Sequence, residues 1–138
     1  MAANNNPIFT AAPDVQWAAA ALTAANTAKD GTGTVATVFT ADATNGGKVK
    51  KLIARAIGTN VATVLRIFVN NGSTNATPGN NVLIAEMTLS ATTLSEVAAL
   101  ASYELPLDLD MPAGYKLNCT IGTTVSAGYM LSAVGSKF

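Results

Sequence analysis

Residues 63–89 read TVLRIFVNNGSTNATPGNNVLIAEMTL, which is two apolar runs separated by a loop of small and polar residues. Both runs are rich in the β-branched residues that favour strands. Asn71-Gly72 and Pro78-Gly79 supply turn chemistry between the runs. The stretch therefore predicts two antiparallel strands, 63–70 and 81–89, joined by an exposed, polar loop that is longer than a two-residue turn and free to vary.

The same alternation of short apolar segments and turn residues continues along the chain. Further strands are predicted at residues 34–40, 48–58, 99–109, 115–121 and 128–134. The Ala-rich segment 15–31 shows no apolar stripe at helical spacing, so we favour an eighth strand there, with a helix as the alternative.

Eight strands without helices between them predict an all-β fold, an antiparallel sandwich or a barrel. We favour a single-domain, jelly-roll-like β-sandwich, because eight is the strand number of a jelly roll. Residues 1–14 have no apolar period and are predicted to form an extended N-terminal arm, which leaves residues 15–138 as the sandwich domain.

The chain is neutral overall and poor in charge. Eight Lys and Arg residues balance eight Asp and Glu residues, and charged residues make up 12% of the 138 positions. Net charge therefore gives no reason to expect nucleic acid or an anionic membrane as a partner. So few charges favour an oligomer or assembly that covers part of the surface. We expect neither a signal peptide nor a transmembrane helix, since no leader pattern and no sufficiently long apolar run is present.

The residue types exclude several kinds of active site. The chain has no histidine and one cysteine, Cys119, so a Ser-His-Asp triad, a Cys-His pair and the usual zinc sites cannot form within it. Cys119 lies on the apolar side of an alternating strand and is predicted to be a small core residue. No cofactor or metal is expected.

Two charged clusters invite a functional interpretation. Glu104, Asp108 and Asp110 alternate in ELPLDLD and would share one strand face, as catalytic or calcium-binding carboxylates do; a solvated outer face explains them better. Pro106 marks the same strand as bent or at a sheet edge. The basic run 48–51 with Arg55 lacks neighbouring aromatic residues for base stacking, so we do not expect it to bind nucleic acid.

Strands 48–57 and 63–70 carry apolar residues on both faces, whereas a lone sandwich needs only one apolar face per strand. Either another segment or another subunit covers the second face, or the residues are scattered surface aliphatics. The arm contributes an apolar pair, and a single tryptophan follows it. The predicted interface residues are Ile8, Phe9, Trp17, Ile53, Arg55, Ile57 and Phe68.

Four stretches resemble a group of small proteins encoded among tailed-bacteriophage structural genes: LTAANTAKDGTGTVATVFTA (22–41), GTNVATVLRIFVNNGSTNAT (58–77), SEVAALASYELPL (95–107) and MPAGYKLNCTIGTTVSAGY (111–129). The resemblance covers residues 22–134 and consists of strands and turns, not of a catalytic motif. It implies a virion component, best matched by a capsid decoration or cement protein. No functional residue is carried over from it.

The resemblance sets the functional expectations. It implies a non-enzymatic β-sandwich that is made in the host cytoplasm, forms a dimer or trimer, and binds the major capsid protein on the capsid surface. One alternative is a tail- or fibre-associated module that binds a host glycan through loops 71–81 and 122–128. Another is an enzyme that acts on a polysaccharide through Glu104 and Asp108.

Overall fold

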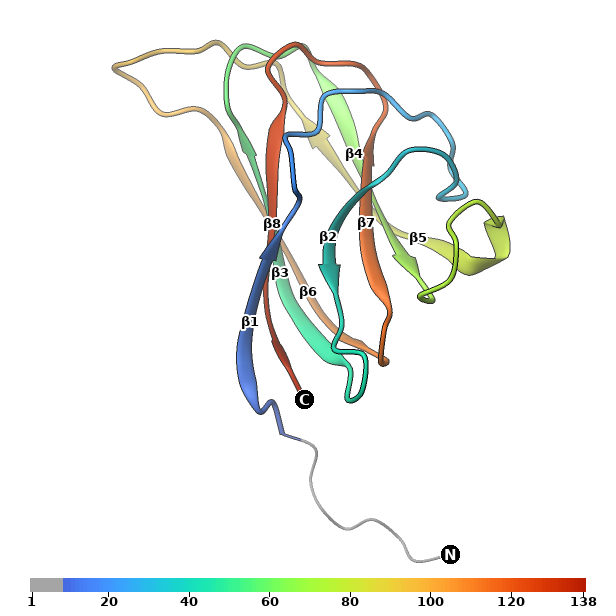
Figure 1. Ribbon diagram of the computed structural model, residues 1–138. Helices are drawn as coiled ribbons and strands as arrows, with labels where there is room; N and C mark the ends of the chain where they lie inside the picture. Colours follow the sequence, from blue (N-terminus) through green and yellow to red (C-terminus); the bar gives the residue numbers. More distant parts are fainter. Residues whose placement is uncertain (1–8) are drawn as a thin grey trace, which may run out of the picture.

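Two four-stranded antiparallel sheets face each other in the computed structural model, which describes residues 9–138 (Figure 1). The strands are β1 (Ala12–Trp17), β2 (Ala36–Thr40), β3 (Gly47–Ala56), β4 (Thr63–Asn70), β5 (Asn81–Leu89), β6 (Ser102–Met111), β7 (Lys116–Ile121) and β8 (Tyr129–Lys137). A 3₁₀ turn, η1 (Pro78–Asn80), precedes β5. Sheet A has the order β1-β8-β3-β6, and sheet B has the order β2-β7-β4-β5.

The strand pairs are nested around the β4–β5 hairpin. From the hairpin outward they are β4 with β5, β3 with β6, β2 with β7 and β1 with β8, all antiparallel. The pairs β3–β8 and β4–β7 join them into two sheets. This is the jelly-roll arrangement, so the predicted fold class is confirmed, and the hairpin encoded by residues 63–89 lies at its centre.

Alternating side chains from both sheets fill the space between them. In β7, Leu117, Cys119 and Ile121 are completely buried, as the alternation in that strand predicts. Cys119 is a core residue, as expected, and burial raises the pKa of its thiol well above the ordinary value. In β6, the odd-numbered residues from Tyr103 to Leu109 pack against the core, while the even-numbered residues are exposed.

The N-terminal third differs from the prediction. The first strand begins at Ala12, within the segment expected to be an arm, and it ends at Trp17. Residues 18–35 form a long connection that belongs to neither sheet, although isolated bridges pair Leu22 with Tyr129 and Ala25 with Ile121. Consecutive small alanines offer neither an alternating face for a strand nor a stripe for a helix, which explains why this segment follows the surface.

Asparagine side chains hold the 18–35 connection in place. Figure 1 shows the connection passing β7 toward η1 before it returns to β2. There, Asn75 Nδ2 donates to the carbonyl oxygens of Gly31 and Gly33, at 3.2 and 2.7 Å, and Asn81 Nδ2 donates to the Asp30 carbonyl at 3.1 Å. The loop between β4 and β5 is therefore anchored by these contacts and is not the independent hairpin tip that its sequence suggests.

A further asparagine, Asn60, joins three loops at one end of the sandwich. Asn60 is buried; its Nδ2 donates to the Gly58 and Gly128 carbonyls, and its Oδ1 accepts from the amides of Ala127 and Gly128. Its backbone exchanges two hydrogen bonds with Thr92. The β3–β4, β5–β6 and β7–β8 loops thus meet at one residue.

Replacing Asn60 with alanine leaves two backbone amides and two carbonyls without their buried partner. We expect Asn60→Ala to lower the free energy of unfolding by about 3 kcal/mol, since buried unsatisfied groups are costly. Urea denaturation followed by circular dichroism measures this. Asn45→Ala is the control, because Asn45 is exposed and its side chain makes no hydrogen bond to any residue from 9 to 138. Equal midpoints for the two variants would contradict the role assigned to Asn60.

Candidate interaction surface

The outer face of sheet A carries exposed apolar side chains that no described segment covers. Because directly paired residues share a face, the register gives the rows of this surface. One row contains Trp17, Ser132, Ile53 and Glu104, and the next contains Val15, Val134, Lys51 and Pro106. Met130 and Arg55 pair in the row beyond Trp17.

We call Val15, Trp17, Ile53, Met130 and Val134 the sheet A apolar face. Trp17 is 66% exposed, Val15 53% and Met130 43%, while Ile53 and Val134 are half-buried. Large apolar side chains gathered on one face of a sheet differ from scattered surface aliphatics, which makes this face a candidate interaction surface. An exposed tryptophan adds to this, because tryptophan is enriched among the residues that dominate binding energy.

Charged pairs lie beside the apolar face, on β3 and β6. Lys51 Nζ is 3.3 Å from Glu104 Oε1, and Lys48 Nζ is 2.9 Å from Asp108 Oδ1 and 3.5 Å from Asp110 Oδ1. The hydrogen bond to Asp108 raises the pKa of Lys48. Each predicted carboxylate is thus exposed and bound to a lysine, as on a solvated face. Within residues 9–138, no group of three or more potential metal-ligating side chains is present.

The strand that carries these carboxylates is bent and lies at the sheet edge, as Pro106 predicts. Val49 pairs with Leu109 and Lys51 pairs with Pro106, so β6 has one residue more than β3 between these pairs. Asp108 lies in this bulge with a φ of 47°, a conformation that Asp tolerates better than most residues. The bulge prevents a straight row of carboxylates from forming.

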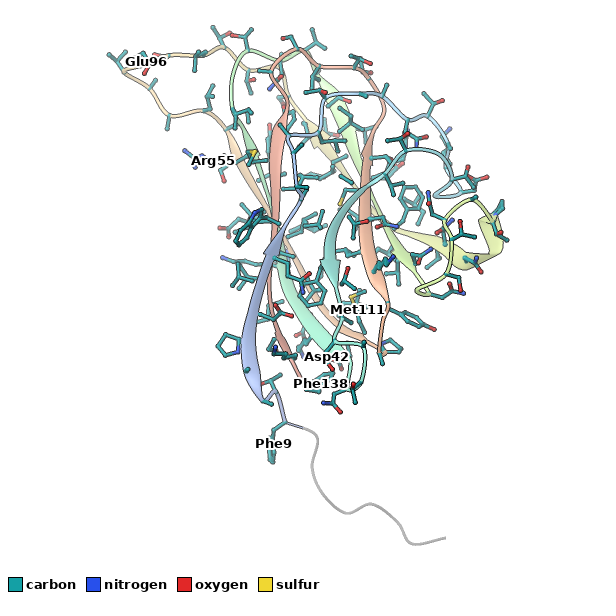
Figure 2. All side chains as sticks on the ribbon, in the orientation of Figure 1. Phe9, Asp42, Arg55, Glu96, Met111 and Phe138 are labelled. Atoms are coloured by element: carbon teal, nitrogen blue, oxygen red, sulfur yellow. The ribbon has the colours of Figure 1, made fainter. Side chains whose placement is uncertain are left out.

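The structure brings together some of the predicted interface residues. Trp17, Ile53 and Arg55 lie on the outer side of sheet A, and Figure 2 shows Arg55 pointing away from the sandwich. Arg55 takes part in no ion pair within the described part of the chain. Ile57 follows the end of β3 and is 45% exposed. Phe9 is exposed near the start of β1, and Ile8 lies outside the described residues.

Phe68 was expected on a free outer face, and that prediction is wrong. Its side chain is completely buried within this single chain. The register of β4 against β5 shifts between Ile67 and Phe68, and Phe68 then pairs with Leu83 on β5 and Asn118 on β7. This face of sheet B is the one crossed by the anchored 18–35 connection. For β4 the chain buries Phe68 on its second face, whereas no segment of residues 9–138 covers the outer face of β3.

The projecting loop between β5 and β6 was not predicted from the sequence. Residues 90–101 connect β5 to β6 and extend beyond both sheets, with Glu96 near the tip (Figure 2). Val97 is 97% exposed and Leu94 is 53% exposed. The strand predicted at 99–109 overlaps the end of this loop, because β6 begins only at Ser102.

One surface hollow of about 510 Å³ lies where β1 begins, between Thr10, the β6–β7 turn and Phe138. The charged side chains among its described lining residues are Lys48 and Asp110, which pair with each other at 3.5 Å. In the described part of the chain, no helix is long and apolar enough to span a membrane.

No family model, no curated protein and no solved structure matches this chain.

The contrast between Phe68 and Ile57 is measurable. We expect Phe68→Ala to lower the free energy of unfolding by about 3–5 kcal/mol, since it empties a completely buried site. Ile57→Thr, at a half-exposed position in the same predicted set, is expected to cost less than about 1 kcal/mol. Urea denaturation of both variants provides the measurement. A small loss for Phe68→Ala would mean that its face is open in solution.

Proposed function

We propose that this protein is a structural component of a tailed-bacteriophage virion, a capsid decoration protein that self-associates and binds the assembled capsid lattice. It acts by burying surface and not by chemistry. The observation that carries the proposal is the sheet A apolar face, which residues 9–138 leave uncovered although Phe68, on the outer face of β4, is completely buried.

The composition of this surface fits a binding role. Its apolar centre contains Trp17, and the lysines and carboxylates at its side are already paired within the chain. A partner can approach such a surface without leaving those charges unpaired, which is the costly outcome at an interface. The projecting loop, with Val97 exposed, offers a second contact beyond the sheets.

Preference for the assembled state is the physical basis of stabilisation. A protein that binds neighbouring capsid subunits only when they are assembled shifts the equilibrium toward assembly by its binding free energy. An oligomer with two or three identical surfaces gains avidity, because the later contacts form at high effective concentration. Moderate contacts at each surface are then sufficient.

The alternatives have less support from the geometry. In the loop between β4 and β5, the side-chain amides of Asn75, Asn80 and Asn81 donate to carbonyl oxygens of the chain itself, so they are not free to bind a glycan. Glu104 and Asp108, the residues of the enzymatic alternative, are engaged by two different lysines on an open surface. Such a surface does not exclude water around either carboxylate.

Co-sedimentation with capsids of the phage of origin, stripped of their minor proteins, tests the proposal. We expect the wild-type protein to pellet with the capsids at a fixed stoichiometry. Met130→Glu places a charge in the sheet A apolar face and is expected to weaken binding by at least about tenfold. Ile84→Glu is the control, because Ile84 has a similar exposure (38%) but lies on sheet B. A wild-type protein that stays in the supernatant would contradict capsid binding.

A further inference from the structure

We infer that β1 is a self-association edge, which pairs antiparallel with β1 of a second copy and joins the two A sheets into one eight-stranded sheet. The inference deepens the self-association that the proposed function includes. Its test uses the purified chain without capsids, so that its failure is distinct from a failure to bind the lattice.

The four edge strands differ in how well they resist pairing. Sheets avoid edge-to-edge association through short strands, bulges, prolines and charges. β6 has Pro106, a bulge and three outward carboxylates. β5 has a register shift and Glu86 on its outer side, and β2 has five residues and a shift between Thr37 and Phe39.

β1 lacks most of these protections. Its six residues keep an unbroken register with β8, from Ala12 opposite Lys137 to Trp17 opposite Ser132. Its only charged residue is Asp14, which is half-buried and accepts a hydrogen bond from Gln16 Nε2 at 2.9 Å. The residues at the free edge that point to the outer face, Val15 and Trp17, are apolar and exposed.

Within residues 9–138, the backbone of β1 has N–H and C=O groups without a partner, and they follow the pattern that an antiparallel partner requires. Ala18 N donates to Leu131 O at 3.0 Å, so the alternation of an antiparallel ladder directs the amides of Gln16 and Asp14 toward β8 as well. The N–H and C=O groups of Val15 and Trp17 then point away from the sheet. The backbone of Pro13 also points away from the sheet, as expected of a proline in an edge strand. Pro13 has no N–H to donate to a second strand, but it lies near the end of β1, so only one hydrogen bond is lost there.

If a twofold axis at Gln16 relates the two copies, the outward N–H and C=O groups of one β1 strand form hydrogen bonds with those of the other. It places Val15 opposite Trp17 of the second copy and Trp17 opposite Val15 of the second copy, which forms each hydrogen bond twice. In this register Gln16 is paired with Gln16 of the second copy, and no two residues of like charge lie opposite each other. The aromatic and β-branched pair that results is among the favourable cross-strand pairs. Trp17 and Val15 belong to the sheet A apolar face, so the pairing makes that face continuous across the dimer.

A second copy fits this edge better than an unrelated strand, since the edge is complementary to itself in both backbone register and side chains. An edge strand of another protein, such as a capsid subunit, is the competing occupant. The two kinds of pairing form under different conditions. Pairing of β1 with β1 of a second copy occurs in the purified protein, whereas pairing with a strand of another protein requires that protein.

Multi-angle light scattering on the purified chain, across a dilution series, is the direct test. We expect a mass of twice 14.0 kDa at high concentration and dissociation on dilution. Val15→Pro removes an outward N–H and no bond to β8, and Val15→Lys adds an edge charge; each is expected to raise the dissociation constant at least about tenfold. Val82→Lys is the matched control, because Val82 is 55% exposed on the β5 edge.

The single tryptophan reports on this surface specifically. Because Trp17 is 66% exposed in the isolated chain, its fluorescence is expected to shift to shorter wavelength as the dimer forms, and the shift is expected to be lost in Val15→Pro. A monomeric wild-type protein at every concentration would overturn the inference. So would a dimer whose mass and tryptophan emission are unchanged by both Val15 variants, with thermal melting confirming that the variants are folded.

Discussion

The pairing of β4 with β5 is the constraint on which the rest of the molecule depends. It is the one sheet connection that is local in sequence, and each further pair of the jelly roll extends outward from it. Every other connection between consecutive strands crosses from one sheet to the other, so none of those pairs can form from neighbouring residues alone. The turn residues between 70 and 81 therefore specify more than a hairpin, because they fix the centre around which the two sheets are wound.

Most strands can be predicted from the sequence, but the segments that cover their outer faces cannot. Strands 63–70 and 81–89 were predicted at their observed bounds, because apolar alternation and turn residues are local signals. Phe68 does lie on the face of β4 that the alternation predicts, since the register of β4 with β7 is unbroken, but no local pattern shows that this face is buried in the folded chain. The alternation in residues 48–57 predicts that Ile53 and Arg55 share a face, but it does not predict that Trp17 joins them, which follows only from the register of β1 and β3 on β8.

Asparagine side chains hold several of the long loops of this protein in place through hydrogen bonds to the backbone. Asn60 links three loops, and Asn75 and Asn81 fasten the longest connection to the hairpin loop. An amide both donates and accepts, so one asparagine can bind backbone groups from two segments without a net charge. This explains how a chain with only 12% charged residues keeps long connections ordered, and why the surface that remains uncovered is apolar.

The pairing of β1 with β8 joins the first described strand to the last strand of the chain. It has the greatest sequence separation of any strand pair here, and loop-closure entropy makes such contacts late events in folding. Until β1 docks, the edge of β8 is an open acceptor for any strand of matching register. At high protein concentration the nearest such strand belongs to another molecule, so refolding yields strand-exchanged dimers in competition with monomers. Dilute refolding selects the intramolecular ladder.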